Sequence, residues 1–448
     1  MSKQENEIPP GCIEVKRQTK HLRHRWKWVE TSIWTDNMLT ALENGVKGGK
    51  WFSLIDKVYS KSTLWKAWIK VAENKGAAGI DRVSIERFSE NAEKYLNELR
   101  NDLIKDEYKP EAVRRVYIPK DGGKKRPLGI PTVKDRIVQT AVKMVIEPIL
   151  ENEFCSMSYG FRPGKGCKDA LREVQHWINE GYTWVLDADL QSYFDTIPHE
   201  NLMKKLGQYI SDGRILNLVK GWLKQEIMEE SKSWIPGEGS PQGAVISPLL
   251  ANLYLHDLDT LITKQGIKMV RYADDFVILT KSERTAKIIK DVVEIWTEKN
   301  GLIIHPGKTH IGDCSVEGQG FDFLGYRFEV GTRWIRKKSI QKFRDTIRKK
   351  TKRTCGKSIE YAIKSVNRSL KGWYNYFKHV NKWGDKSLDT FDSFVRRRLR
   401  AVLRVQNKRP GFGRCIKDHI RWPNKYFANL GLFTMSKARA LEIACQSR

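Results

Sequence analysis

Apolar residues recur at helical spacing in three stretches of the sequence. The segment TLWKAWIKVAENKG begins at Thr63, is apolar on one face and ends at Gly76, a residue that commonly stops a helix. A second helix is expected over residues 84–106. Residues 133–150 repeat apolar side chains every three or four positions, which predicts an amphipathic helix.

Strand patterns occupy the middle of the chain. AVRRVYIPK (112–120) alternates like a strand, DGG supplies a turn and KKRPLGIP (124–131) returns, which predicts a basic β-hairpin. TWVLDADL (183–190) is typical of a short buried strand that runs into acidic residues, and IKMVRYADDFVILT (267–280) of two apolar strands that meet at an Asp-Asp turn. Strand patterns stop at about residue 335 and basic helices follow to about 405. The middle is therefore expected to be α+β and the C-terminal third helical.

The charge of the chain narrows its partners. Among 448 residues, 81 Lys and Arg against 53 Asp and Glu leave a net charge of +28, which favours a polyanion such as nucleic acid. Membrane is a weaker candidate, because no apolar run approaches the roughly 20 residues that span a bilayer. The seven cysteines are scattered and never form a C-x-x-C pair. This usage indicates reduced thiols in a cytoplasmic protein, with neither a disulfide framework nor a zinc site.

Two acidic strand ends carry the candidate chemistry. Asp274 and Asp275 form the tip of the YADD hairpin, and two carboxylates there cannot both be buried without partners. An ordinary polar turn is the alternative, because Asp is common in turns. A second acidic strand end, at Asp187 and Asp189, lies upstream, with Asp189 85 residues before Asp274. Hard carboxylate oxygens from two strand ends are what a two-Mg²⁺ phosphoryl-transfer site requires.

The segments D-x-x-x-x-F, SPQG and YADD, in this order, resemble the palm motifs of reverse transcriptases. This resemblance implies that Asp189, Asp274 and Asp275 are the catalytic aspartates. It also implies that they hold two Mg²⁺ ions as cofactors, with Leu190 included among the metal-site residues. Asp187 lies two residues too early for the motif and is the main rival of Asp189.

The same resemblance implies residues that contact the substrate. Phe194 falls on the aromatic position that selects dNTPs over rNTPs, with a plain core aromatic as the alternative. Lys120 and Arg126 of the basic hairpin are candidate clamps for the triphosphate. Gln242 belongs to the SPQG loop, which in the family contacts the incoming nucleotide and the templating base. Lys308 falls where the family carries a lysine proposed to protonate the leaving pyrophosphate, with simple surface charge as the alternative.

Further segments resemble the reverse transcriptase–maturases encoded by group II introns. They are NKGAAGIDRVS (74–84), SYGFRPGKG (158–166) and LKGWYNYFKH (370–379), and the resemblance covers roughly residues 63–405. Only Cys415 and Cys445 occur in the tail, with no His pair beside them, so the chain resembles the endonuclease-less proteins of class C introns. The resemblance implies an α+β right-hand polymerase, with fingers and palm, followed by an all-α thumb or maturase domain.

The expected organisation has four parts. They are a basic and aromatic extension (1–62), reverse transcriptase fingers and palm (63–330), a helical thumb (331–405) and a basic tail that is a candidate DNA-binding segment (406–448). The resemblance places a primer grip at Phe323, Leu324 and Gly325, with plain apolar packing as the alternative. Basic and aromatic residues expected to bind nucleic acid in the thumb are Arg336, Lys337, Lys338, Arg344, Arg348, Trp373 and Tyr374. Some of the thumb aromatics must belong to its core instead.

The resemblance implies RNA-dependent DNA polymerase activity together with maturase binding of group II intron RNA, in splicing and retrotransposition. The expected partners are intron RNA, an RNA template with a DNA primer, target DNA and dNTPs, while the oligomeric state is left open between monomer and dimer. Three alternatives remain open. They are a free-standing reverse transcriptase in repair or phage defence, an RNA-binding splicing factor whose polymerase has decayed, and a DNA-templated polymerase. The intact set of three aspartates argues against the decayed enzyme.

Overall fold

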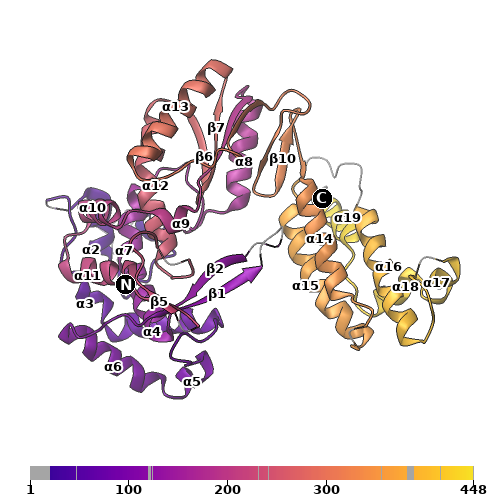
Figure 1. The fold of residues 1–448 in the computed structure, drawn as a ribbon, viewed down its shortest axis with the longest axis horizontal. Coiled ribbons are helices and arrows are strands. Elements are labelled where there is room, and N and C mark those ends of the chain that lie inside the picture. Colours follow the sequence, from indigo (N-terminus) through magenta and orange to yellow (C-terminus); the bar gives the residue numbers. More distant parts are fainter. Residues whose placement is uncertain are drawn as a thin grey trace, which may run out of the picture. The chain divides into compact units, whose positions relative to one another are not determined.

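The computed structural model describes residues 21–46, 48–119, 123, 125–230, 232–240, 242–354, 356–380, 388–413 and 415–446. These residues divide into two compact units (Figure 1). The first, called the mixed unit, lies within Met1–Tyr182 and Leu186–Ile311, and the second, called the helical unit, within Thr183–Val185 and Gly312–Arg448. None of the described helices combines the length and the apolar character that a bilayer-spanning segment needs.

The mixed unit combines helices with one four-stranded sheet and most of a second. Its helices are α2 (Asp36–Asn44), α3 (Ile55–Val58), α4 (Lys61–Glu73), α5 (Ile85–Glu90), α6 (Ala92–Lys105), α7 (Val133–Glu153), α8 (Cys167–Asn179), α9 (Tyr193–Thr196), α10 (His199–Tyr209), α11 (Gly213–Leu223), α12 (Ser247–Lys264) and α13 (Glu283–Lys299). The helix expected over 84–106 is interrupted at Asn91, whose backbone angles (φ −132°, ψ 31°) are not helical. The helices expected from Thr63 and over 133–150 are confirmed as α4 and α7.

Each sheet contains one of the predicted hairpins. The hairpin sheet has the order β2-β1-β4-β5, and the acidic sheet has the order β6-β7-β3-β8. The strands are β1 (Val113–Pro119), β2 (Lys125–Ile130), β3 (Trp184–Asp189), β4 (Ile227–Glu229), β5 (Lys232–Trp234), β6 (Lys268–Tyr272), β7 (Asp275–Thr280) and β8 (His310–Asp313). β1 pairs antiparallel with β2, and β6 pairs antiparallel with β7. Both hairpins predicted from the sequence are therefore present.

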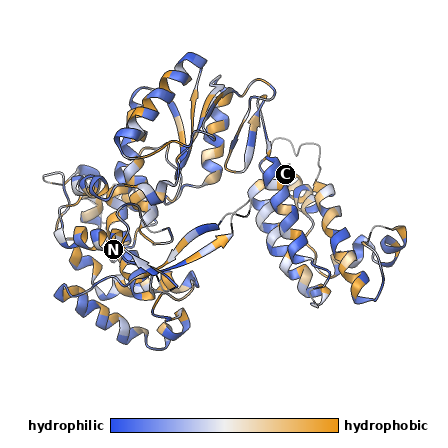
Figure 2. Cartoon of the chain, viewed as in Figure 1, coloured by the Kyte–Doolittle hydropathy of each residue, from blue (hydrophilic) through white to orange (hydrophobic). Residues whose placement is uncertain are grey.

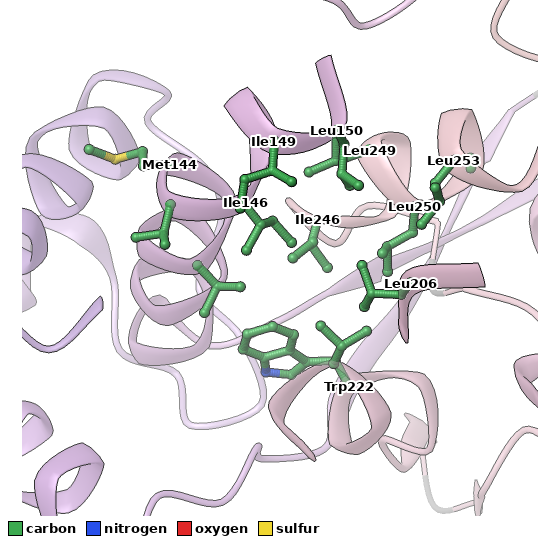
Figure 3. Close-up of a cluster of buried hydrophobic side chains, with 14 of the residues drawn as sticks. Met144, Ile146, Ile149, Leu150, Leu206, Trp222, Ile246, Leu249, Leu250 and Leu253 are labelled. Atoms are coloured by element: carbon green, nitrogen blue, oxygen red, sulfur yellow. The ribbon is translucent and has the colours of Figure 1, made fainter. Parts of the chain in front are cut away.

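Helix α7 lies in the middle of the mixed-unit core and is buried along most of its length, including polar residues such as Asp135 and Gln139. Its buried residues extend from Val133 to Leu150, and they pack with α10, α11 and α12 in a cluster that includes Leu206, Trp222 and Leu250 (Figure 3). A helix that is buried on most of its sides needs neighbouring elements on each of those faces. The following elements supply that cover.

The described part of the expected N-terminal extension also covers α7. Trp26 and Trp34 are buried, and the Trp34 indole Nε1 donates a hydrogen bond of 3.3 Å to the carbonyl of Met144 in α7. The Arg25 guanidinium reaches Asn152 at the end of the same helix, at 3.0 Å. The described residues of the expected extension over 1–62 are therefore part of the folded mixed unit, whose core buries Trp26 and Trp34.

The helical unit has a core of its own. Its elements are β9 (Phe321–Phe323), β10 (Tyr326–Glu329), β11 (Thr332–Ile335), α14 (Lys337–Lys350), α15 (Ile359–Phe377), α16 (Leu388–Gln406), α17 (Ile416–Arg421), α18 (Asn424–Asn429) and α19 (Met435–Gln446). Only Phe343 and Ile347 of α14 are buried, and most of that helix is hydrophilic (Figure 2).

Two expected boundaries shift in the helical unit. The unit includes residues from Gly312 onward, before the expected boundary at 330/331, because the turn after β9 is bonded to the helices: the Tyr376 hydroxyl donates to the Leu324 carbonyl at 2.7 Å. The tail is not a separate segment either. Trp422, Phe427 and Met435 of the tail are buried in the same core as α14, α15 and α16. The described tail is therefore part of the folded helical unit.

Candidate active site

The acidic residues lie at the ends of neighbouring strands of the acidic sheet. Val185, Leu186 and Ala188 of β3 are buried, and the side chains of Asp187 and Asp189 are less so. Because side chains alternate along a strand, these two aspartates share one face of the sheet.

Asp274 occupies the turn between β6 and β7. Tyr272 pairs with Asp275 across the hairpin, so Ala273 and Asp274 form its two-residue turn. Ala273 has a φ of 62°, in the left-handed region that tight hairpin turns require. The turn thereby brings Asp274 to the end of β7, the strand next to β3.

The segment that contains SYGFRPG packs against this turn. The backbone of Gly160 lies so close to Ala273 that a Cβ at Gly160 would overlap the Ala273 nitrogen. The Asn252 side chain of α12 donates 2.8 Å to the Gly160 carbonyl and accepts a 3.0 Å bond from Arg271. The close packing explains why glycine is needed at this position of the motif.

The negative charge of Asp189 acts on Asp274. The pKa of Asp274 is raised, chiefly by burial and further by the negative charge of Asp189, while Arg126 and Arg271 act in the opposite direction. Asp187 instead lies 3.7 Å from the imidazole Nε2 of His310 on β8. Between the two candidates on β3, the geometry favours Asp189 as the partner of the YADD aspartates.

Backbone hydrogen bonds set the direction of the Leu190 carbonyl. His305 N donates to Asp189 O at 2.8 Å, and Gln191 N donates to Ile303 O at 2.8 Å. In an antiparallel pair the residue between two such bonds points its own carbonyl to the opposite edge. That edge of β3 faces β7. The Leu190 side chain is buried in the core, so its backbone carbonyl is the atom suited to a metal-site role.

Lys308 forms an ion pair with Asp189. Its ammonium Nζ contacts Asp189 Oδ2, and the lysine side chain is 55% exposed. The contact places a positive charge directly on the carboxylate that the sequence assigns to the metal site. Lys308 therefore lies within the acidic cluster.

A hydrogen-bonded chain joins the basic hairpin to the SPQG loop. Arg126 Nε donates 2.8 Å to Gln242 Oε1, and Gln242 Nε2 donates 2.8 Å to the Asp195 carboxylate. The backbone carbonyl of Gln242 accepts a further bond of 2.7 Å from Gly129 N. Asp195 was not among the predicted site residues. Its position directly after the predicted sugar-contact residue Phe194 was the available signal.

Both the backbone and the ring of Phe194 contact neighbouring residues. The Ser240 amide donates 2.6 Å to the Phe194 carbonyl, and the ring of buried Tyr193 meets the Phe194 ring edge-on with centroids 5.5 Å apart. Phe194 is only partly buried, so part of its ring remains available to a sugar. Lys120, the other predicted triphosphate clamp, lies outside the described residues.

The predicted primer grip lies in the helical unit. Phe323 is completely buried, and Leu324 and Gly325 form the turn between β9 and β10 with positive φ values of 47° and 85°. Ser339 Oγ donates 3.0 Å to the Gly325 carbonyl, which ties the turn to α14. Contact with a primer through this turn would involve Leu324 and the backbone, because the Phe323 ring belongs to the core.

The predicted nucleic-acid residues of the helical unit separate into two groups. Lys337, Lys338 and Arg348 are exposed, and Arg336 and Arg344 are half-buried. Tyr374 is buried and donates its hydroxyl to Glu442 at 3.0 Å. Trp373 packs against Phe343, Phe377 and Phe391, with ring centroids 4.6 to 5.1 Å apart. The assignment of Tyr374 to a nucleic-acid surface is corrected, because its ring is buried in the core, whereas the half-buried Trp373 ring packs against that core and stays a prediction.

A further cavity in the helical unit is strongly basic. Its volume is about 670 Å³, and arginines from α14 and α16 line it together with His419. The lining arginines are Arg344, Arg348, Arg396, Arg397 and Arg400. An anionic backbone is the complement of such a surface.

The oxygen atoms at the end of the acidic sheet suit divalent cations whose coordination is completed by substrate and water. Among the described residues, no three His, Cys, Asp or Glu side chains converge closely enough to form a metal site by themselves. Mg²⁺ is commonly held by one or two carboxylates together with substrate phosphates and water. Asp189, Asp274 and the Leu190 carbonyl supply hard oxygen ligands from two adjoining strand ends, which fits that mode of binding.

Two family models match the chain. Residues 118–328 match the reverse transcriptase (RNA-dependent DNA polymerase) family, and residues 340–422 match the group II intron, maturase-specific domain. Protein YkfC of Escherichia coli (strain K12) is 35% identical over 312 residues, which cover 59% of this chain and 78% of YkfC.

Other relatives are matched over a smaller share of their length. The group II intron-encoded protein LtrA of Lactococcus lactis subsp. cremoris is 36% identical over 228 residues, which cover 48% of this chain and 37% of LtrA. Among solved structures, a chain of a partial Cas6-RT-Cas1–Cas2 complex aligns with a TM-score of 0.36 and 26% identity, over 55% of this chain and 43% of that chain.

Proposed function

The chain belongs to the family of group II intron reverse transcriptase–maturases, and we propose that it copies RNA into DNA and binds group II intron RNA as a maturase. The reaction is the template-directed addition of dNTPs to a primer 3′ end. Retrotransposition by target-primed reverse transcription would use the same polymerase site on target DNA.

The observation that carries the polymerase proposal is the meeting of two distant acidic segments. Asp189 ends β3, and Asp274 occupies the turn before β7, the neighbouring strand. The two carboxylates are close enough for Asp189 to raise the pKa of Asp274. Maintaining like charges this close is costly unless a cation joins them.

The residues around this pair fit the roles that phosphoryl transfer requires. Asp189, Asp274 and Asp275, with the Leu190 carbonyl, would hold two Mg²⁺ ions, which when bound supply charge stabilisation and activation of the primer hydroxyl. Arg126, which opposes the raised pKa of Asp274, is positioned to bind the triphosphate.

Three further residues act on the nucleotide. The partly exposed Phe194 ring excludes a 2′-hydroxyl, and Gln242, held by Arg126 and Asp195, positions the nascent base pair. Lys308, already on Asp189, is placed to neutralise or protonate the leaving pyrophosphate.

The maturase proposal rests on the helical unit. The matched maturase-specific segment contains the arginine-lined cavity and most of the exposed basic residues of α14. Lys337, Lys338, Arg344 and Arg348 contact RNA phosphates in this proposal, with Arg336 at the start of the helix. The intron RNA supplies the catalytic groups of splicing, and the protein stabilises the folded RNA.

Primer extension on poly(rA) with an oligo(dT) primer, Mg²⁺ and dNTPs tests the polymerase. The double variant Asp274→Ala, Asp275→Ala should lose at least about 10³-fold in rate, because the charge stabilisation of the transition state is removed. The exposed Asp291→Ala on α13 is the matched control and should extend like the wild type. Absence of extension by the wild type, together with salt-sensitive RNA binding, would contradict the polymerase and leave an RNA-binding splicing factor.

Splicing of the intron RNA by the same double variant tests the maturase separately. Splicing should be retained, because the helical unit is unchanged. If the wild-type protein did not promote splicing of the intron RNA, the maturase role would be contradicted and the polymerase result would be unaffected.

A further inference from the structure

A cavity of about 200 Å³ lies on one face of the hairpin sheet, beside the Gln242 loop. Its sheet side comes from alternate positions of neighbouring strands. These are Val113 and Arg115 of β1, Pro127 and Gly129 of β2, Ile227 of β4 and Trp234 of β5. Its other side is formed by residues that follow β5, together with Asp195: Pro236, Glu238, Gly239, Ser240 and Gln242.

The cavity is fixed by backbone contacts. Gly129 N donates 2.7 Å to the Gln242 carbonyl, and a Cβ at Gly243 would overlap the Gly129 carbonyl oxygen. On the far side, Gly239 N donates 2.8 Å to the Ile197 carbonyl, and a Cβ at Gly239 would overlap the Asp195 backbone. These backbone contacts therefore fix the distance between the sheet side of the cavity and the side formed by the Gln242 loop.

The lining suits a flat, uncharged ring. The Arg115 guanidinium carbon lies over the Trp234 ring, 5.1 Å from its centroid, and Trp234 remains 36% exposed, so the cavity is lined by an indole ring and a guanidinium plane. Engineered apolar cavities of about 150 Å³ take up benzene, so this cavity has room for a larger ring. Both aromatic rings and arginine planes are surfaces on which nucleobases stack.

The charges of the cavity select the base rather than the phosphate of a nucleotide. The carboxylates of Asp195 and Glu238 line the cavity and would repel a phosphodiester. The same carboxylates accept hydrogen bonds from the amino groups of bases. A nucleotide would therefore insert its base and keep its backbone outside, near the basic side chains of the hairpin.

The cavity and the candidate nucleotide site share residues. Gln242 and Asp195 line the cavity, and Asp195 directly follows Phe194, the residue proposed to contact the dNTP sugar. Gln242 also bonds to Arg126, proposed to contact the triphosphate. A base in the cavity thus lies next to the nascent base pair, on its hairpin-sheet side.

We infer that this cavity binds the unpaired template base one position ahead of the templating base, stacked on Trp234. The inference rests on the proposed polymerase function and specifies how its template is held. Stacking there separates the next template base from the one being copied, so that one base at a time is presented to the dNTP.

Single-nucleotide incorporation on two RNA templates tests the inference with the full chain. One template ends at the templating base, and the other carries one further 5′ nucleotide. The wild type should use the longer template with a KM for template–primer about tenfold lower, since stacking of one base on an aromatic side chain has an effect of this order. A template with an abasic residue at the added position should behave like the shorter one.

Variants locate the effect at Trp234. In Trp234→Ala the ratio of the two KM values should fall to about one, and in Trp234→Phe, which retains a ring, most of the ratio should remain. Trp65→Ala provides the matched control, because Trp65 is a comparably exposed tryptophan on α4 and does not line the cavity. The abasic comparison uses the wild type alone and stays decisive if a variant does not fold.

The outcomes are distinguishable. Equal use of both templates by the wild type, or an unchanged ratio in Trp234→Ala, would overturn the inference and leave the polymerase intact. Failure of the wild type to extend either template would overturn the polymerase proposal and the inference with it.

Discussion

Arg271 on β6 joins the turn that carries Asp274 to helix α12. Its Nη1 donates 2.8 Å to the Ala273 carbonyl, and two other nitrogens form bonds of 2.7 and 2.5 Å with the Asp259 carboxylate. Both side chains of the ion pair are almost fully buried. The position of a candidate metal-binding carboxylate thus depends on a charged pair inside the protein.

Arg271→Ala should lower the free energy of unfolding by about 3–5 kcal/mol, because Asp259 would be left buried and unpaired. Urea unfolding measures the change. The matched control is Lys287→Ala, which breaks the exposed pair with Glu283 on α13 and should cost less than about 1 kcal/mol. A small effect of Arg271→Ala would mean that water reaches Asp259.

Gly160→Ala should reduce primer extension by about 10²-fold, because the added Cβ displaces the Ala273 backbone and misplaces Asp274. Steady-state kcat on an RNA template measures the loss. Gly207→Ala in α10 meets open space and should retain activity. Full activity of Gly160→Ala would contradict the close packing of this segment on the turn.

Asp135 should make stability depend on pH. Burial raises its pKa to about 6 from 3.8, despite a hydrogen bond from the Tyr108 hydroxyl. Between these pH values the folded protein keeps a proton that the unfolded chain has lost. The stability that the protonated form contributes is therefore present at low pH and lost as the pH rises through about 6.

Asp135→Asn removes this titration. The difference in unfolding free energy, variant minus wild type, should increase by roughly 2–3 kcal/mol when the pH is raised from 4 to 7. Urea unfolding at both pH values measures the difference, with exposed Asp291→Asn as the matched control. A difference that does not change with pH would show that Asp135 ionises in the folded protein as it does in the unfolded chain.

Lys308→Met should lower the Mg²⁺ concentration needed for half-maximal extension by up to about fivefold. The reason is that the ammonium no longer competes with the cation for Asp189, and partly exposed pairs contribute at most about 1 kcal/mol. A Mg²⁺ titration of primer extension measures the effect, with the exposed Lys299→Met as control. An increased Mg²⁺ requirement would indicate that Lys308 assists metal binding. If Lys308 protonates pyrophosphate, the maximal rate of primer extension by Lys308→Met should also fall, whichever way the Mg²⁺ requirement changes.

The elements that position the acidic residues were predictable because local pattern determines them. The alternation in β1 and β2, the apolar strands on either side of the YADD turn and the periodicity of α7 appear as expected. Arg126 and Gln242 were predicted singly from motifs, and the structure joins them by a hydrogen bond.

Other features depend on contacts that sequence patterns do not report. Tyr374 and Trp373 occur beside basic residues like RNA-binding aromatics, yet helical periodicity turns them toward the core. Asp195 was not predicted as a site residue, since its partner Gln242 is 47 positions away in the sequence. Trp26 and Trp34 lie in a basic, aromatic stretch of sequence, and their burial in the mixed-unit core depends on distant residues such as Met144 of α7.

The contacts of α19 also have a consequence for the order of events during synthesis. Glu442 accepts hydrogen bonds from Tyr374 and Lys378, and the Met435 amide bonds to Asp392. A nascent chain cannot form these contacts until residues 435–442 have left the ribosome. The residues of the mixed unit, which end at Ile311, are by then already synthesised, so the core of the helical unit is completed after them.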